Sequence, residues 1–160
     1  MLRDAALSDL KFVYDLYMDE TVNPFTAYDP MPLSEFEPIF GELLEETQLL
    51  LWEFEGKTLG MVQIQRGIHR FTHSAHLGGI AISPQRQNEG LGTRLMREVL
   101  EILEKEKLVR VELCVSADNP RGIAFYEKLG FEIEGTMKQY FSRAGREEFF
   151  DEHIMAKFLC

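Results

Sequence analysis

The stretch that decides the fold reads Gln87-Asn88-Glu89-Gly90-Leu91-Gly92. Before it, the run from His76 to Pro84 is apolar, contains small residues and stops at a proline, which predicts a buried strand. After it, apolar residues recur at helical spacing from Leu91 to Leu103, and charged residues occupy the opposite face. A strand therefore leads through a glycine-bearing turn into a helix.

The start of this helix is a predicted anion site. The first N–H groups of a helix have no intrahelical partner and lie at the positive end of the helix dipole, so a phosphate is a natural ligand there. Gly90 and Gly92 have no Cβ atom, which lets a diphosphate approach the backbone closely. The same glycines also fit a plain chain reversal, and a second motif favours the anion site.

The second motif follows a strand-like run from Val109 to Val115. It reads Asn119-Pro120-Arg121-Gly122-Ile123-Ala124-Phe125-Tyr126-Glu127-Lys128-Leu129-Gly130-Phe131. A proline suits the first turn of a helix, and a glycine suits the residue after its end. The segment therefore predicts a helix from about Pro120 to Leu129 that Gly130 terminates.

Together the two motifs resemble the GNAT (Gcn5-related N-acetyltransferase) superfamily. The pattern Gln87-x-x-Gly90-x-Gly92 is similar to the acetyl-CoA pyrophosphate loop of that family, and Asn119 with Tyr126 is similar to the segment that follows it in the family. The resemblance covers the chain from about Leu49 onward, and the first third only in layout.

The resemblance implies the fold. We expect an α/β (α+β) protein with a single-domain GNAT fold over residues 1–160, a mixed six- to seven-stranded sheet with a central splay, and about four flanking helices. Ser8 and Ser34 are the expected N-caps of the first two helices. The expected strands are Leu2 to Ala5, Gln48 to Phe54, Thr58 to Arg66, His76 to Pro84, Val109 to Val115, Phe131 to Phe141 and Glu147 to Phe158.

The resemblance also implies acetyl-CoA as the acyl donor. The pantetheine arm would bind Asn119, which can also cap its helix, and the free backbone groups of Ile80, Ala81 and Ile82. The diphosphate would bind the turn and the helix start, at Gln87, Asn88, Glu89, Gly90, Leu91, Gly92 and Thr93. The local cations expected to assist are Arg86, Arg94 and Arg121.

Two residues are the candidate catalytic groups. Tyr126 stands at the family position of the general acid that protonates the departing thiolate, and a phenol with a pKa near 10 is protonated at neutral pH. Tyr126 could instead be a packed aromatic. His76 stands about where many relatives carry a glutamate base, and a neutral imidazole can do that work. Glu53 and His73 compete with it, and solvent can also take the proton.

The acceptor is expected to be a primary amine of a small molecule or a peptide N-terminus, attacking the thioester directly in a ternary complex. Phe25, Tyr28 and Met31 lie in a loop that either contacts this substrate or simply packs. The segment Asp151 to Ala156 is predicted as a strand beside the acceptor site. Cys114 is disfavoured as an acyl carrier because it lies in a strand with no obvious basic partner.

Composition limits the partners. A formal net charge of −10 argues against nucleic-acid binding and either favours a cationic amine or simply aids solubility. No apolar run is long enough for a membrane span, and no secretory signal is evident. Cys114 and Cys160 fit free thiols in the cytoplasm. No residue set has metal-ligand spacing. The resemblance allows a homodimer.

Two other functions compete with an acetyltransferase. A non-catalytic acyl-CoA-binding or regulatory module would keep the loop without turnover, although Tyr126 argues against it. A dinucleotide-binding βαβ protein is disfavoured, because the loop lacks the G-x-G-x-x-G spacing and no acidic residue ends a second parallel strand at the expected distance.

Overall fold

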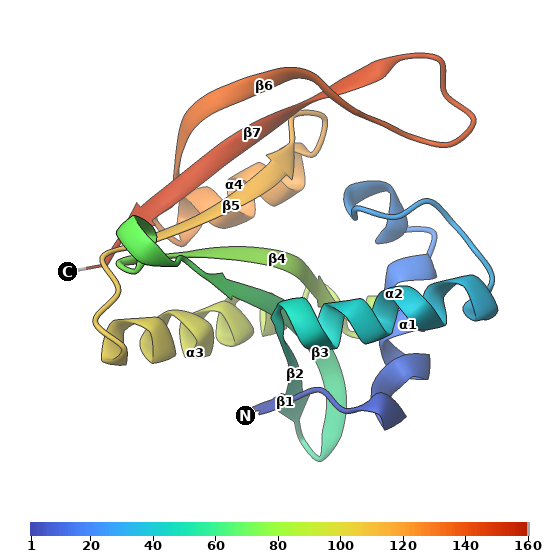
Figure 1. The fold of residues 1–160 in the computed structure, drawn as a ribbon, viewed down its shortest axis with the longest axis horizontal. Helices are drawn as coiled ribbons and strands as arrows, with labels where there is room; N and C mark the ends of the chain where they lie inside the picture. Colours follow the sequence, from blue (N-terminus) through green and yellow to red (C-terminus); the bar gives the residue numbers. More distant parts are fainter. Residues whose placement is uncertain (160) are drawn as a thin grey trace.

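The chain folds into seven strands and four α-helices over the part that the computed structural model describes, residues 1–159 (Figure 1). The strands are β1 (Leu2–Asp4), β2 (Gln48–Phe54), β3 (Lys57–Arg66), β4 (Ser74–Ile82), β5 (Arg110–Ser116), β6 (Glu132–Ser142) and β7 (Phe149–Phe158). The α-helices are α1 (Leu10–Met18), α2 (Leu33–Glu46), α3 (Leu91–Lys105) and α4 (Pro120–Lys128). Short 3-10 helices are η1 (Leu7–Asp9), η2 (Asn23–Phe25), η3 (His69–Phe71) and η4 (Pro84–Arg86). The predicted fold class and element order are confirmed.

The strand boundaries lie within two residues of the predicted ones, and β4 shows the largest difference. It runs from Ser74 to Ile82 instead of from His76 to Pro84. The earlier start follows from pairing, because Ala75 is in register with Arg66 of β3. The earlier end follows from Pro84, which has no N–H for a sheet hydrogen bond and opens η4.

The sheet has the order β1-β2-β3-β4-β5-β7-β6, and every neighbouring pair is antiparallel except β4 and β5. Helix α3 makes the crossover that a parallel pair needs. The register of β4 with β5 runs from Ser74–Arg110 to Leu77–Leu113. Over residues 1–159 the pairing stops there, although β4 continues to Ile82. The predicted central splay is this divergence of the two strands.

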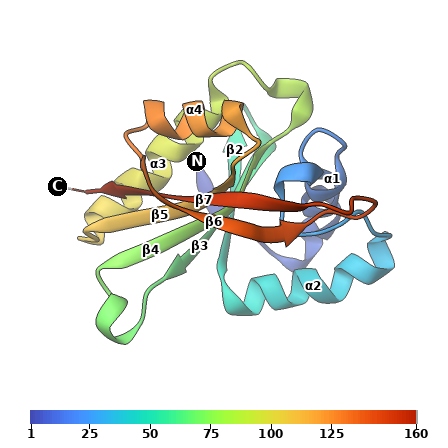
Figure 2. The ribbon, with the colours of Figure 1, turned by 90° about the horizontal axis from the view of Figure 1, so that it is seen from above.

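Helices cover both faces of the sheet, and each face has its own apolar core (Figure 2). On the α3 and α4 side, Leu95, Met96 and Leu103 of α3 are fully buried in one core. On the α1 and α2 side, Phe36 and Phe40 pack in the other. The helical spacing that predicts an amphipathic α3 is thus explained, because its apolar stripe lies on the sheet.

The predicted N-cap at Ser8 is wrong. Ser8 lies inside η1, and the carboxylate of Asp9 accepts the N–H of Ala6 at 2.8 Å instead. The guanidinium of Arg3 donates to both oxygens of the same carboxylate, at 2.8 and 3.0 Å. A charged carboxylate held by a bidentate arginine is a stronger acceptor than a serine hydroxyl, so Asp9 sets the start of this segment.

The predicted N-cap at Ser34 is also wrong, whereas the predicted N-cap and terminating glycine of α4 are right. Helix α2 begins at Leu33 after Pro32, whose carbonyl accepts first-turn N–H groups, and Ser34 therefore lies inside the helix. Asn119 does cap α4, since its side-chain oxygen accepts the N–H of Gly122 at 2.9 Å. Gly130 follows α4 with φ +90°, as a terminating glycine requires.

Replacing Asp9 with asparagine should lower the free energy of unfolding at pH 7 by about 1–2 kcal/mol, because a charge-assisted pair with Arg3 is lost. Arg3 holds the pKa of Asp9 below its ordinary value of 3.8. The ion pair therefore stabilises the fold fully above pH 3.8, and this contribution disappears as the pH falls through the folded-state pKa. Urea unfolding of both proteins from pH 7 to pH 2.5 measures the difference.

The matched control is Asp15→Asn, which removes an exposed carboxylate that contacts Lys11 one helical turn away. Its effect should stay within about 0.5 kcal/mol at every pH. Equal effects of the two substitutions would show that Asp9 has no special role at the start of η1.

Candidate functional site

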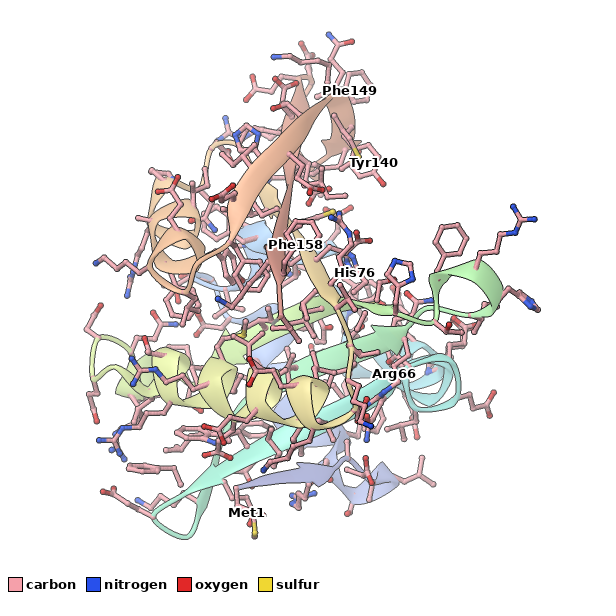
Figure 3. All side chains as sticks on the ribbon, turned by 90° about the vertical axis from the view of Figure 1, so that its left-hand side faces the viewer. Met1, Arg66, His76, Tyr140, Phe149 and Phe158 are labelled. Atoms are coloured by element: carbon pink, nitrogen blue, oxygen red, sulfur yellow. The ribbon has the colours of Figure 1, made fainter. Side chains whose placement is uncertain are left out.

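A cavity of about 890 Å³ lies between the sheet, α1, the loop 23–30 and the β6–β7 hairpin. Its floor carries Gln63 of β3, His76 of β4, Cys114 of β5 and Glu152 of β7. Figure 3 shows His76 on β4 below the long hairpin that bears Tyr140 and Phe149. The cavity is thus built by segments from most of the chain, and it opens onto the point where β4 leaves β5.

The splayed end of β4 has a bulge at Gly79. Its φ is +53°, and an added Cβ would lie 2.6 Å from Nε2 of Gln63 and 2.7 Å from the hydroxyl of Tyr17. Glycine meets both conditions without strain, whereas a residue with a Cβ would have to displace the ends of these two side chains. From Gly78 to Ile82 the backbone has no strand partner on the β5 side within residues 1–159. Backbone groups in such a position need water or a ligand to complete them.

The turn between β4 and α3 leaves free space beside its backbone at Gly90. Gly90 has φ +75° as the N-cap of α3, and an added Cβ there would meet no atom within 4 Å. Asn88 is also left-handed, with φ +69°, a conformation that asparagine tolerates. At Gly92 an added Cβ would lie 3.3 Å from the Phe125 ring of α4. The space beside Gly90, at the N-terminus of α3, is therefore free of protein atoms and leaves room for a diphosphate.

The three predicted phosphate-binding cations differ in their contacts. Arg86 pairs with Glu89 at 2.8 Å and also contacts Glu55, so its charge is already balanced. Arg94 lies over the ring of Phe54, 5.1 Å from its centroid. Arg121, in the first turn of α4, donates to the side-chain oxygen of Asn88 in the turn. Within residues 1–159 it has no acidic partner, so Arg121 is the cation best placed at the turn.

Tyr126 lies on α4, outside the set of residues that line the cavity. Its half-buried ring contacts those of Phe125 and Phe131 edge-on, with centroids 5.1 and 6.0 Å away. It packs against the same core as Ile80 and Ile82 of the splayed strand. Burial raises the pKa of Tyr126 to about 12, so the phenol is protonated at neutral pH.

Of the candidate bases, the structure brings only His76 into the cavity. Its Nδ1 lies 3.7 Å from a carboxylate oxygen of Glu112 on β5. Glu53 lies on β2, paired with Arg3 at 2.7 Å, and does not line the cavity. His73 lies before β4 and is also absent from the lining. Two of the three predicted contact residues of the aromatic loop, Phe25 and Tyr28, also line the cavity.

Met31 does not line the cavity with them. It packs against the core of α1 and α2, and its carbonyl accepts the Tyr14 hydroxyl at 2.8 Å. Met31 therefore has the second of the two roles that the sequence left open, ordinary packing.

Sequence reasoning did not single out most polar residues of the cavity, among them Tyr17, Gln63, Arg143 and Glu152, although it predicted the strand of Glu152 beside the acceptor site. Alternation along β7 could have indicated Glu152, because the strand buries Met155 in the α3 and α4 core and so turns alternate residues to the other face. A polar residue such as Gln63 between the buried Val62 and Ile64 was a similar signal. No local pattern indicates Tyr17 or Arg143.

Arg143 joins three distant segments at the rim of the cavity. Its Nε donates to the carbonyl of Pro24 at 2.8 Å, and its two Nη atoms donate to the carboxylate of Asp118 at 2.6 and 3.1 Å. The guanidinium also lies 4.2 Å from the centroid of the Phe150 ring. We call Arg143 with its partners the Arg143 cluster; these partners are Pro24, Phe25, Ser116, Asp118, Phe141 and Phe150.

Comparison with known proteins places this geometry in a family. Residues 10–131 match the sequence model described as the acetyltransferase (GNAT) family. The chain belongs to this family. The predicted resemblance is confirmed, and the open turn at Gly90 and the splayed β4 are the GNAT features expected from it.

Relatives within the family are named acetyltransferases. L-amino acid N-acetyltransferase AaaT of Escherichia coli (strain K12) is 42% identical over 89 residues, which cover 55% of this chain and 53% of that protein. The match thus spans about half the length of AaaT. A putative ribosomal protein bS18-alanine N-acetyltransferase of Bacillus subtilis (strain 168) is 26% identical over 148 residues, covering 91% of this chain and 89% of that protein.

A solved structure agrees over the whole chain. The ribosomal-protein-alanine N-acetyltransferase from Brucella melitensis superposes with a TM-score of 0.79 and 25% identity, covering 99% of each chain. Among residues 1–159, no helix has the length and apolar character to cross a membrane. In the same residues, no group of three His, Cys, Asp or Glu side chains is arranged to hold a metal ion.

Proposed function

We propose that this GNAT protein transfers the acetyl group of acetyl-CoA to a primary amine of a small molecule or a peptide N-terminus, by direct attack in a ternary complex. The observation that carries the proposal is the unpaired stretch of β4 from Gly78 to Ile82. At one end Gly78 and Gly79 line the large cavity, and at the other the chain continues into the open turn at Gly90. One strand thus connects an acceptor cavity with a diphosphate site.

The residues of the turn fit a bound diphosphate. The backbone from Gln87 to Thr93 would hold it, with Arg121 as the nearby cation. Ile80, Ala81 and Ile82 would offer backbone groups to the pantetheine arm and the thioester oxygen. The Asn119 oxygen already caps α4, which leaves its amide NH₂ for the arm. Acetyl-CoA supplies the activated acyl group, as a thioester.

Two side chains are the sequence-predicted candidates for moving protons. Tyr126, protonated at neutral pH, would give its proton to the departing sulfur. His76, which lines the cavity, is the proton acceptor that the sequence predicts for the amine. These two residues come from opposite faces of the sheet, since Tyr126 packs on the α3 and α4 core and His76 faces the cavity. Attack and departure would therefore occur on different sides of β4.

The test is an acetyl-CoA turnover screen over amino acids, polyamines, aminoglycosides and alanine-ending peptides. We expect release of free thiol with at least one class, together with a product heavier by one acetyl group. Gly90→Val is the control that should abolish turnover and weaken coenzyme A binding, because a β-branched residue is strained at φ +75° and fills the open turn.

Acetyl-CoA binding without thiol release across the whole screen would instead favour the alternative, a non-catalytic acyl-CoA-binding or regulatory module. Absence of coenzyme A binding would overturn both functions. A cytoplasmic location and a homodimer stay predictions.

A further inference from the structure

We propose that Glu152, on the strand that the sequence predicts beside the acceptor site, binds the ammonium group of the acceptor and takes its proton. The proposal rests on the proposed acetyltransferase function and deepens it by defining the substrate as an amine that enters the cavity as a cation. It also assigns the general base to β7 instead of to His76 of β4.

Glu152 is a carboxylate without a partner. It lies on the floor of the cavity, half-buried, in register with Ser116 of β5 and Met137 of β6. Within residues 1–159 its side chain makes no hydrogen bond and has no cation within 4.0 Å. Burial raises the pKa of this carboxyl above its ordinary value of 4.5. A half-buried anion of this kind gains most from a ligand that brings a positive charge.

The other charged side chains on the hairpin and the loop 23–30 that line the cavity already have a polar partner. Arg143 is paired with Asp118, so it does not neutralise Glu152. Asp29 accepts the backbone N–H of Ala144 at 2.9 Å. Arg146 is exposed and lies 3.5 Å from Glu148. The charged side chains of the hairpin and of the loop 23–30 are therefore engaged at the rim, and Glu152 is the free charge on the floor.

The remaining titratable groups around Glu152 are neutral side chains or have a partner. Burial, and then the nearby carboxylates of Glu152 and Glu112, raise the pKa of Cys114 to about 11. Burial also raises the pKa of Tyr17 and of Tyr28. Tyr140 lies exposed at the rim, and His76 contacts Glu112.

The proton balance is simple. The acceptor enters as R–NH₃⁺ and forms an ion pair with Glu152, which then takes one proton and leaves a neutral amine. The nitrogen lone pair attacks the thioester carbon, the C–N bond forms and the C–S bond breaks. The sulfur receives a proton from Tyr126, which regains one from solvent on its own side of the sheet. The nitrogen loses its second proton after the attack, and Glu152 passes both nitrogen protons to solvent in turn, so one H⁺ is produced per turnover.

The experiment compares Glu152→Gln with wild type, using the amine of the screen that wild type acetylates fastest. We expect kcat/KM at pH 7 to fall about 10²-fold, a typical contribution of a general base. The loss should shrink as the pH rises toward the pKa of the amine, because an amine that is already neutral needs no base. Coenzyme A affinity should not change. Glu148→Gln, on the exposed hairpin, is the matched control and should behave as wild type.

His76→Gln is the comparison that decides between the two bases. If His76→Gln shows the pH-dependent loss while Glu152→Gln has the wild-type profile, the proposal is wrong and the sequence-predicted base is right. A loss in Glu152→Gln that is equal at every pH would likewise exclude a proton-accepting role. Wild type that acetylates no amine of the screen would refute the proposed function itself, a result distinct from all of these.

Discussion

Tyr126→Phe should lower kcat by about 10²-fold or more at pH 7 while leaving the affinity for coenzyme A unchanged. The substitution removes one oxygen and keeps the ring, so the edge contacts with Phe125 and Phe131 persist. What is lost is the proton for the departing sulfur. Because burial raises the pKa of Tyr126 to about 12, the phenol stays protonated through the neutral range, and its ionisation should not limit the rate below about pH 11.

Steady-state kinetics with thiol detection measures this effect, and isothermal titration with coenzyme A checks binding. Tyr14→Phe is the matched control, since Tyr14 lies on α1 outside the residues that line the cavity and its phenol donates to the carbonyl of Met31 at 2.8 Å. It removes the same atom away from α4 and should leave kcat within about twofold of wild type. Equal rates for the two variants would mean that Tyr126 is a packed aromatic, the alternative that its sequence context also allows.

The elements near the two motifs were predictable because local chemistry decides them. Asn119 and Gly130 bracket α4, and both roles depend only on the backbone beside them. The failures at Ser8 and Ser34 have a different origin. A hydroxyl near a helix start is one acceptor among several, and at η1 the carboxylate of Asp9 wins because Arg3 arrives from β1 to hold it. The start of this segment therefore depends on a tertiary contact between Arg3 and Asp9, which a local sequence pattern does not show.

The candidate site shows the same division. The turn around Gly90 could be predicted because its glycine conformation and the helix that follows are local. Which of the three nearby arginines is free to bind a phosphate could not be predicted from the sequence. Arg86 is balanced by Glu55 on the β2–β3 turn, and Arg121 reaches Asn88 from α4. These contacts join segments that are distant in the sequence, so proximity to the loop gives no order among the three cations.

The acceptor side was the least predictable part. It is assembled by contacts such as that of Arg143 with Pro24, which are separated by 119 residues. Ala144 and Asp29 make a second contact of this kind. The periodicity and spacing of residues within one segment do not predict contacts between segments so far apart in the sequence. The loop 23–30 could be recognised as turn chemistry, but not as one wall held by the β6–β7 hairpin.

Arg143→Ala should therefore affect both stability and the acceptor. Its side chain is only 17% exposed, and removing it leaves Asp118 without its partner and ends the cation–π contacts of the Arg143 cluster. We expect the free energy of unfolding to fall by about 2 kcal/mol, discounted because Asp118 is itself partly exposed. The loop 23–30 also loses its link to the hairpin, so KM for the acceptor should rise about tenfold.

Urea unfolding and steady-state kinetics measure the two effects, and the affinity for coenzyme A separates them. The diphosphate turn shares no contact with the Arg143 cluster, so coenzyme A affinity should remain at the wild-type value. Arg143→Lys keeps the charge but not the bidentate geometry toward Asp118, and should fall between wild type and Arg143→Ala. Arg146→Ala removes a neighbouring exposed arginine and should change little. A rise in KM of the same size in Arg146→Ala would mean that positive charge on the hairpin, and not the bridge over the cavity, controls acceptor binding.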